Sequence, residues 1–392
     1  MKKSFVLFFM VLALIVSSFA FASCTVGGNT GSGSHGGNAS SESNFDNESP
    51  RESLTESISQ SESENVSISA DESESENESV IESESTTESE RESEEVDPTD
   101  TKWFKFTLLD GGSGYSVSKC DDYDESTYPT KIVIPGIYKN MPVISVGAGA
   151  FFECGSLTSV TIPSSVISIG DLAFYNCGGL ISVSIPSSVI SIGDGAFFGC
   201  DSLTSVGIPG SVESIGGLPF LNCCSLEQII VSEANTVYCS VNNCLIEKAS
   251  RTLVAGCKTS IIPSDDSVTS IGDNAFYGCN EKLYTKADGV VYVDNWAVEV
   301  VDDTIISVNI TPGTRGIADS AFLFCDSLTS VEIPNSVTSI GDWAFGYCRS
   351  LTSVVFNGTM AQWKDVEKGM SWLDGTKVTT IKCSDGEASI YE

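Results

Sequence analysis

The chain has 392 residues, a formal net charge of −33 and one histidine, His35. Such an acidic chain argues against nucleic acid or an anionic membrane surface as a partner. A single histidine leaves no His-dependent catalytic triad. Residues 42–100 alone hold 21 of the 53 aspartate and glutamate residues, so the charge is concentrated in a segment too poor in apolar residues to form a core.

The N-terminus has the pattern of an export signal, with two lysines followed by an apolar run over residues 5–16. Residues 21–24, Phe-Ala-Ser-Cys, resemble a lipobox, in which Cys24 is lipidated and becomes the new N-terminus. Two alternatives stay open: ordinary signal-peptidase cleavage after the Ala-Phe-Ala of residues 20–22, and an uncleaved membrane-spanning helix. We expect a signal peptide over residues 1–23 and an extracellular protein, held at the cell surface by the lipid on Cys24.

Residues 24–100 are rich first in Gly, Ser and Asn and then in Ser and Glu. With so little apolar area to bury, ordering this segment could not offset the loss of chain entropy. Repulsion between like charges also extends it. This composition predicts a disordered tether. The alternative is an acidic cation-binding tract, for which the segment has no fixed geometry.

A period of 23 residues runs through the rest of the chain. One unit reads Val-x-x-Ile-Gly-x-x-Ala-Phe-x-x-Cys-x-x-Leu-x-x-Val-x-Ile-Pro. A unit of this size cannot bury its own apolar face, so successive units must stack on one another. The cysteines in phase are Cys154, Cys177, Cys200 and Cys223, and later Cys325 and Cys348.

The unit divides into two sides. Apolar residues alternate with small polar ones from Leu157 to Ile162, which predicts a strand, and Pro163 ends it. We expect Gly170 to turn the chain by adopting a positive φ. The Ala-Phe-x-x-Cys segment that follows, residues 173–177, is expected to fill the far side of the core on a short helical turn.

The recurring Ala-Phe-x-x-Cys, Leu-x-x-Val and Ile-Pro elements, in one phase over residues 130–383, resemble the BspA-like class of leucine-rich repeats of bacterial and protist surface proteins. Residues 103–135 resemble that family's β-rich N-terminal cap, and the stretch that begins Val-Phe-Asn-Gly-Thr at residue 355 resembles its terminal unit. The resemblance implies adhesion or ligand binding at the cell surface and brings no catalytic residue set. The pattern is broken at residues 218–220 and 280–304.

We therefore predict a β-rich leucine-rich-repeat solenoid of about ten turns of a 23-residue repeat, with a parallel sheet on one side and short helical turns opposite. The expected divisions after the tether are an N-terminal cap over 101–140, the solenoid over 141–354 and a C-terminal cap over 355–392.

The in-phase cysteines are expected to stack in the core as small apolar fillers. One cysteine every 23 residues does not converge on a point as metal ligands must, so no metal or cofactor is expected. Cys239, Cys244 and Cys257 lie outside the regular phase and are the better candidates for disulfides.

Two sets of residues are candidate ligand contacts. The outward strand positions form a hydroxyl-rich face, which could bind a glycan or a partner protein and could equally be an ordinary solvated face. Aromatic residues in the later turns are the stronger candidates, with packing in the core or cap as the alternative role. These candidates are Ser159, Thr161, Ser182 and Ser184 on the strands, and the tryptophans Trp296, Trp343, Trp363 and Trp372.

The aspartates that follow the recurring glycine occur once in each turn and are expected to form turns rather than a catalytic carboxylate pair. The sequence thus predicts a non-catalytic surface adhesin that recognises extracellular protein or glycan. Two alternatives stay open: a structural surface-layer component that self-associates, and a polysaccharide-binding accessory protein. The sequence does not predict the oligomeric state.

Overall fold

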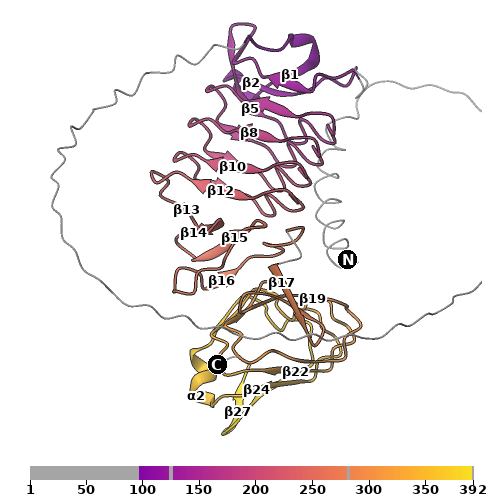
Figure 1. Cartoon of the computed structure of the whole chain (residues 1–392), viewed down its shortest axis with the longest axis vertical. Helices are drawn as coiled ribbons and strands as arrows, with labels where there is room; N and C mark the ends of the chain where they lie inside the picture. Colours follow the sequence, from indigo (N-terminus) through magenta and orange to yellow (C-terminus); the bar gives the residue numbers. More distant parts are fainter. Residues whose placement is uncertain (1–96, 123–126, 280–282, 391–392) are drawn as a thin grey trace, which may run out of the picture. The chain divides into compact units, whose positions relative to one another are not determined.

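The computed structural model describes residues 97–122, 127–279 and 283–390. The predicted signal peptide, Cys24 and residues 24–96 of the predicted tether lie outside these residues. Residues 97–100 of the predicted tether are described, and the Thr99 N–H donates to the Val133 carbonyl at 3.0 Å. The described chain is a β-solenoid of about ten turns built on the 23-residue repeat, as predicted (Figure 1). None of the described helices is both long and apolar enough to span a bilayer.

Each regular turn contributes one strand to each of two parallel sheets. The first sheet is formed by the Leu-x-x-Val-x-Ile segments, and Val160 lies opposite Val183 in the next turn. The second is formed by the short Ser-Ile segments, so that Ile169 lies opposite Ile192. The first sheet contains β3 (Lys131–Val133), β6 (Ser159–Thr161), β8 (Ser182–Ser184), β10 (Ser205–Ile208) and β12 (Gln228–Val231). The second contains β5 (Met141–Val146), β7 (Ser168–Ile169), β9 (Ser191–Ile192) and β11 (Ser214–Ile215).

The far side of each turn is not helical, which corrects the prediction of short helical turns. Leu172 and Asn176 have φ angles of 53° and 54°, and left-handed residues at this spacing prevent a right-handed helix. Their N–H groups therefore point along the stack instead of back along their own segment. Leu172 donates to the Asp194 carbonyl at 2.8 Å and Asn176 to the Phe198 carbonyl at 2.7 Å. We call this third set of backbone bonds between turns the far-side ladder.

Gly170 is required for a different reason from the one expected. It has no positive φ, and the left-handed residue comes two positions later. A Cβ on Gly170 would lie 2.5 Å from the backbone nitrogen of Ala148 in the preceding turn. At the equivalent Gly193 it would lie 2.4 Å from the Asp171 nitrogen. The glycine thus allows two backbones to approach closely.

Stacked phenylalanines and cysteines fill the core between these sides. Phe174 stacks on Phe151 and on Phe197, with ring centroids 5.3 Å apart in both pairs. The Cys177 thiol donates to the Phe151 carbonyl at 3.0 Å, and the Cys200 thiol donates to the Phe174 carbonyl at 3.2 Å. The recurring cysteines are therefore buried apolar fillers, as predicted, and also hydrogen-bond donors between turns.

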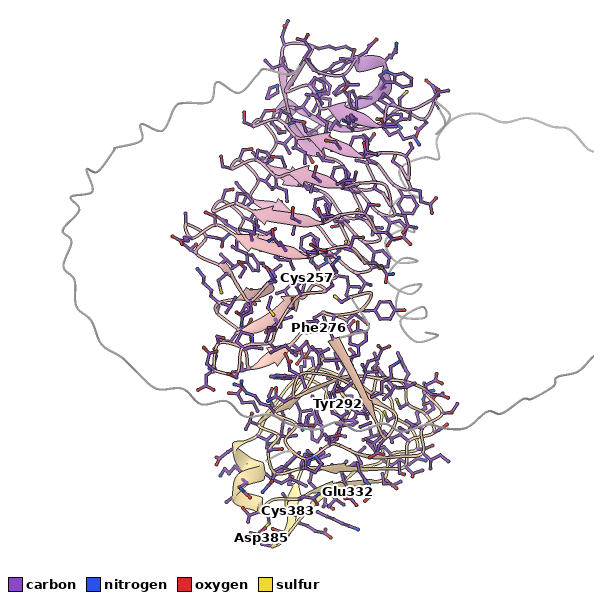
Figure 2. The ribbon with its side chains drawn as sticks, in the orientation of Figure 1. Cys257, Phe276, Tyr292, Glu332, Cys383 and Asp385 are labelled. Carbon is purple, nitrogen blue, oxygen red and sulfur yellow. The ribbon has the colours of Figure 1, made fainter. Side chains whose placement is uncertain are left out.

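None of the cysteines in the described ranges forms a disulfide, and Cys239, Cys244 and Cys257 are thiols. Hydrogen bonding with the Cys154 thiol, together with burial, raises the pKa of Cys177. Burial raises the pKa of Cys244 to about 12. The thiols of Cys177 and Cys244 are therefore held in the protonated form, which can donate a hydrogen bond. Cys257, labelled in Figure 2, is also fully buried.

Two antiparallel meanders interrupt the repeat. The second coincides with the irregular region expected near residues 280–304. At the end of each meander the chain rejoins the stack through a parallel pairing, of β15 with β16 and of β19 with β21. The first comprises β13 (Tyr238–Val241), β14 (Cys244–Glu247) and β15 (Thr252–Ala255), before β16 (Ser270–Ile271). The second comprises β17 (Tyr284–Ala287), β18 (Val290–Val293) and β19 (Trp296–Val300), before β21 (Gly316–Ile317).

The remaining strands belong to two further sheets, separate from the first two and mainly parallel, and short elements cover both ends. Thr359 caps the one α-helix among the described residues, α2, and its side chain and backbone bond reciprocally with Gln362. The later strands are β20 (Ser307–Asn309), β22 (Ser330–Ile333), β23 (Ser339–Ile340), β24 (Ser353–Phe356), β25 (Glu367–Lys368) and β26 (Thr380–Cys383). The end elements are η1 (Thr101–Trp103), β1 (Phe104–Leu108), η2 (Asp110–Gly112), β2 (Tyr115–Lys119), β4 (Ile137–Tyr138), α2 (Met360–Asp365) and β27 (Gly386–Ser389).

Candidate functional site

The outward strand positions lie where the repeat places them. Thr161, Ser182 and Ser184 are exposed and Ser159 is half-buried, because the alternate residues on β6 and β8 point into the core. Glu332 occupies an equivalent exposed position on β22 (Figure 2). The result is a solvated, hydroxyl-rich face. A ligand on this face stays a prediction.

Three of the four candidate tryptophans belong to the core, which corrects their assignment to a surface cluster. Trp296 and Trp363 are each 1% exposed and Trp372 is 7% exposed. Trp363 packs between Phe356 and Trp372, with ring centroids at 5.1 and 5.7 Å. These rings fill the last turns of the solenoid, the alternative role that the sequence left open.

Trp296 is accommodated by a specific change in the repeat. Other turns have a serine before the Ile-Gly pair, but the turn beside Trp296 has Gly316. A Cβ on Gly316 would lie 2.1 Å from the Trp296 ring. A glycine in place of that serine was therefore a signal, readable in the sequence, that a large side chain packs at this position.

Trp343 lies on the far side of the turns and forms a partly exposed aromatic stack with two residues. Its ring is nearly parallel to that of Tyr347, with a centroid distance of 5.7 Å and an angle of 7°. Tyr347 also stacks on Phe324 of the preceding turn at 5.3 Å. The aromatic stack is thus Phe324, Trp343 and Tyr347. Sequence reasoning missed Phe324, whose position holds a glycine or an asparagine in most earlier turns.

All three residues of the aromatic stack have left-handed backbones. Their φ angles are 59° for Phe324, 54° for Trp343 and 53° for Tyr347. For residues of this size the left-handed conformation costs about 1–2 kcal/mol each. The far-side ladder holds them there, since Phe324 donates to the Gly346 carbonyl at 2.9 Å and Tyr347 to the Asp374 carbonyl at 2.6 Å. The same left-handed backbone occurs at the equivalent positions of earlier turns, such as Leu172 and Asn176, so it belongs to the repeat and does not by itself mark a site.

The surroundings of the aromatic stack are open and carry planar polar groups. Tyr347 is 38% exposed, and its ring lies over Gly375, where a Cβ would be 2.8 Å from the ring. Two residues after Phe324 and Tyr347, Asp326 and Arg349 form an exposed ion pair at 3.3 Å. Aromatic faces can pack against an apolar surface, while a carboxylate and a guanidinium accept and donate hydrogen bonds beside it.

The recurring aspartates form turns, as expected, but through contacts between turns. The Asp194 carboxylate accepts a hydrogen bond from the Gly217 N–H at 2.7 Å, and Asp319 accepts one from the Asp342 N–H at 2.8 Å. Asp319 lies beside the second meander and is half-buried. Burial raises its pKa to about 7, and the neighbouring carboxylates of Asp342 and Asp273 add to the effect.

Asp319→Asn should stabilise the protein at pH 8 by roughly 1–2 kcal/mol, allowing for its partial exposure, and have little effect at pH 4. The folded state binds this proton more tightly than the unfolded chain does. Asp319 therefore destabilises the fold increasingly as pH rises from its ordinary pKa of 3.8 to about 7, and by a constant amount above that. Asparagine keeps the oxygen that accepts the Asp342 N–H. Chemical denaturation at both pH values measures the difference.

Asp194→Asn is the matched control, because it alters the same type of turn at an exposed position. It should change stability by less than about 0.5 kcal/mol at either pH. Equal stabilisation by both substitutions would show that burial of Asp319 is not the cause.

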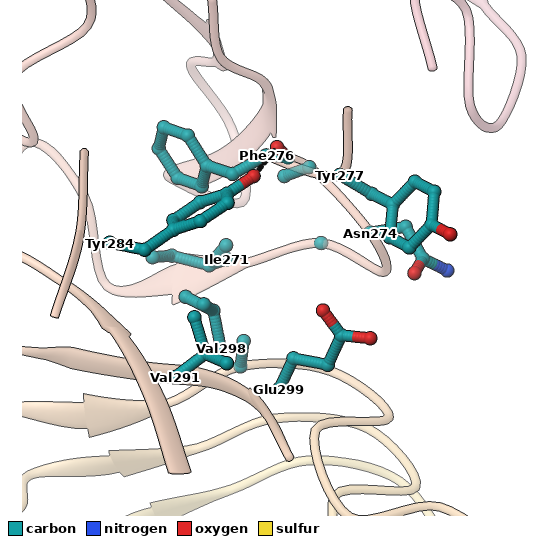
Figure 3. A pocket seen from close by; sticks show the side chains of 11 residues that line it. Ile271, Asn274, Phe276, Tyr277, Tyr284, Val291, Val298 and Glu299 are labelled. Atoms are coloured by element: carbon teal, nitrogen blue, oxygen red, sulfur yellow. Dashed lines mark hydrogen bonds between the residues drawn. The ribbon is translucent and has the colours of Figure 1, made fainter. Parts of the chain in front are cut away.

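A small pocket of about 20 Å³, open to solvent on one side, lies beside the second meander (Figure 3). Its upper wall comes from the turn around Phe276, and its lower wall comes from β18 and β19. Glu299 of β19 projects between them (Figure 3). No group of three or more His, Cys, Asp or Glu side chains in the described ranges is arranged to hold a metal ion.

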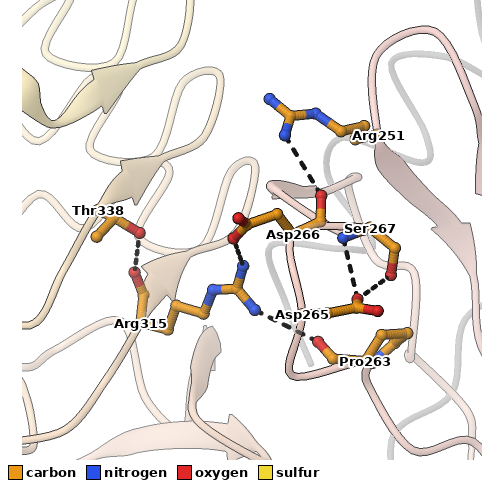
Figure 4. A network of polar contacts seen from close by, with 7 residues as sticks. All are labelled: Arg251, Pro263, Asp265, Asp266, Ser267, Arg315 and Thr338. Atoms are coloured by element: carbon orange, nitrogen blue, oxygen red, sulfur yellow. Dashed lines mark hydrogen bonds and ion pairs between the residues drawn. The ribbon is translucent and has the colours of Figure 1, made fainter.

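A polar network ties the segments on either side of the second meander together (Figure 4). The Arg315 guanidinium bonds to the Asp266 carboxylate at 3.1 Å and donates to the Pro263 carbonyl at 3.4 Å. Arg251 donates to the Asp266 carbonyl at 3.3 Å. Because the Asp266 side chain is 93% exposed, this ion pair contributes little energy and mainly orders the loop.

The comparisons with known proteins agree with this repeat geometry. The model of the BspA type leucine-rich repeat region matches in six copies, over residues 125–245 and 248–366. No curated protein matches the chain. Among solved structures, a leucine-rich repeat protein of T. pallidum is 21% identical, with 70% of this chain and 86% of that chain covered and a TM-score of 0.33.

Two further solved structures are similar. A leucine-rich repeat protein of Bacteroides ovatus is 20% identical over 72% of this chain and 80% of that chain, with a TM-score of 0.34. A leucine-rich cell surface protein of Faecalibacterium prausnitzii is 21% identical over 69% of this chain and 98% of that chain, with a TM-score of 0.24. The family model covers more than half of the sequence, and the chain therefore belongs to the BspA-type leucine-rich-repeat family.

Proposed function

We propose that this protein is a non-catalytic binding protein of the cell surface that recognises an extracellular protein or glycan. The observation that carries the proposal is the aromatic stack of Phe324, Trp343 and Tyr347. Large aromatic side chains are the residues that most often dominate binding energy. Here all three lie on two adjacent turns and are partly exposed, Tyr347 by 38%.

The location follows from the N-terminal sequence. The export signal of residues 1–23 and the lipobox-like Cys24 support a lipid-anchored protein on the outer face of the membrane. The Ser/Glu-rich segment before residue 101 would then separate the solenoid from that anchor. The hydroxyl-rich face of β6 and β8 is a second surface on which a ligand could make hydrogen bonds.

A binding screen of the purified chain on arrays of extracellular-matrix proteins and glycans tests the proposal. Trp343→Ala and Tyr347→Ala should each weaken binding of a captured ligand at least about tenfold, because each removes an aromatic contact. Phe152→Ala is the matched control, since Phe152 is a 37% exposed aromatic on the same side of an early turn.

The screen also separates the proposed function from its alternatives. Light scattering in the same buffer should give a mass that does not change with concentration. Saturable binding that is unchanged by both substitutions would show that the aromatic stack is not the binding site. Absence of any ligand, together with a mass that rises with concentration, would favour a self-associating structural component instead.

A further inference from the structure

The pocket beside the second meander has the composition of a site for an organic cation. Aromatic side chains contribute most of its upper wall, and valines of β18 and β19 line its lower wall (Figure 3). The polar side-chain groups of its lining residues are two tyrosine hydroxyls, one amide and one carboxylate. The residues that the argument uses are Asn274, Phe276, Tyr277, Tyr284, Val298 and Glu299.

The one carboxylate that lines the pocket is that of Glu299. It belongs to none of the ion pairs among the described residues. Burial raises the pKa of Glu299, and the charge of Lys286 offsets this effect only in part. Burial also raises the pKa of the nearby Asp273 to about 6, and the charge of Glu299 adds to it. A cation in the pocket would remove an unfavourable electrostatic arrangement.

The walls of the pocket are held in place by the fold. The Tyr284 hydroxyl donates a hydrogen bond to the Phe276 carbonyl, joining the meander to the turn above it. The far-side ladder reaches this turn through the bond from the Asn222 N–H to the Tyr277 carbonyl at 3.4 Å. After the meander the far-side ladder begins again with the bond from the Ser320 N–H to the Asp342 carbonyl at 2.8 Å. The turn around Phe276 keeps the Ile-Gly-x-x-Ala-Phe pattern of the repeat, whereas Tyr284, Val298 and Glu299 belong to the meander that interrupts it.

We propose that this pocket binds the primary ammonium group of an alkylamine, either a free amine or a lysine side chain. The ammonium would donate hydrogen bonds to the Glu299 carboxylate and the Asn274 amide oxygen. The rings of Phe276, Tyr277 and Tyr284 favour a cation next to them. Val298 provides an apolar contact for the methylene chain.

A metal ion fits this pocket poorly. Calcium requires six to eight oxygen ligands and magnesium requires six, whereas the walls here are mostly carbon. A primary alkylammonium has three N–H donors, which can bond to the carboxylate and the amide, and an alkyl chain, which can pack on the apolar wall. The chemistry of the lining thus favours an organic cation over an inorganic one.

Calorimetric titration of the full chain tests the proposal with n-butylammonium and N-acetyl-lysine methylamide as probes. Both should bind with dissociation constants of about 1 mM, and tetramethylammonium should bind at least about tenfold more weakly because it cannot donate hydrogen bonds. Binding of n-butylammonium without the lysine amide would identify free amines as the source of the ligand. Equal binding of tetramethylammonium would contradict the assignment to a primary ammonium.

Glu299→Gln should weaken n-butylammonium binding at least about tenfold. Glu332→Gln is the matched control for charge, because Glu332 is an exposed carboxylate on β22, and it should leave binding unchanged. Equal binding by the two variants would refute the proposal. Tyr277→Leu provides a second test if Glu299→Gln does not fold, as judged by circular dichroism, and should also weaken binding. Trp343→Ala should not, which separates this site from the aromatic stack.

Discussion

Gly193→Ala is expected to destabilise the folded protein by about 3 kcal/mol or more, an unusually large effect for adding one methyl group. The new Cβ would lie 2.4 Å from the Asp171 nitrogen and 2.6 Å from the Gly170 carbonyl carbon. Both are backbone atoms of the preceding turn, so no side-chain rotation relieves the overlap. The two turns would have to separate, and the bonds between them would lengthen.

Equilibrium denaturation of the purified variant measures this loss. Hydrogen exchange should place it at the far-side ladder, at amides such as that of Leu172, which donates to the Asp194 carbonyl. Gly207→Ala is the matched control, because Gly207 lies on strand β10 with no atom within 4 Å of the added carbon. Its stability should stay within about 0.5 kcal/mol of the parent. Similar losses of stability in the two variants would show that Gly193 is not required for the close approach of the two backbones.

Phe174→Ala is expected to destabilise the protein by about 3–5 kcal/mol. Phe174 is fully buried and lies between two rings of the phenylalanine stack, so its removal leaves a cavity that the neighbouring turns cannot close. Because each turn contacts its neighbours, the loss should be concentrated in the turns on either side. Denaturation followed by circular dichroism gives the total, and hydrogen exchange gives the distribution along the chain.

Phe152→Ala controls for the loss of a phenylalanine side chain. Phe152 is adjacent to the core position of its own turn but is 37% exposed, and it stacks on Tyr175 at 4.6 Å. Its removal should cost no more than about 1 kcal/mol. A loss as large as that of Phe174→Ala would indicate that the outer aromatic residues, and not the inner stack, hold the turns together.

Periodicity predicted the turns because each turn meets nearly the same surroundings. The apolar positions of Leu157, Val160 and Ile162 were sufficient to predict a strand and its inward face, and the structure confirms both. The role of Gly170 could not be read in this way. A repeated glycine is equally compatible with a positive φ and with a close approach of two backbones, and only the distance to Ala148 separates them.

Contacts between turns were the main part that the sequence did not reveal. Leu172 is a good helix former, yet it adopts a left-handed conformation because its N–H bonds to the next turn. Ser188 reads as a solvated turn residue, but its hydroxyl donates to the Val166 carbonyl at 2.6 Å. Bonds of this kind join residues 22 positions or more apart, so local propensity does not report them.

The candidate site was predicted only in part, because the sequence does not show whether an aromatic residue is buried or exposed. Large aromatic residues are suited both to a core and to a binding surface. Trp363 and Trp343 therefore looked alike in sequence, whereas one is buried and the other is partly exposed. The repeat register does not separate them, because the position of Trp343, two residues after the Ile-Gly pair, holds the buried Leu172 in an earlier turn. The Glu299 pocket had no sequence signal either, because β19 belongs to the meander that breaks the repeat.

The buried thiols of the core can report where neighbouring turns of the solenoid separate. Cys177 and Cys200 are fully buried, and each thiol hydrogen is directed at a carbonyl of the preceding turn. An alkylating reagent attacks the thiolate and needs access to sulfur, so it can react with them only after the turn has separated from its neighbour. Cys224 is exposed and can react without such opening. The order in which the remaining cysteines become alkylated thus maps, at a resolution of one turn, where the stack comes apart first.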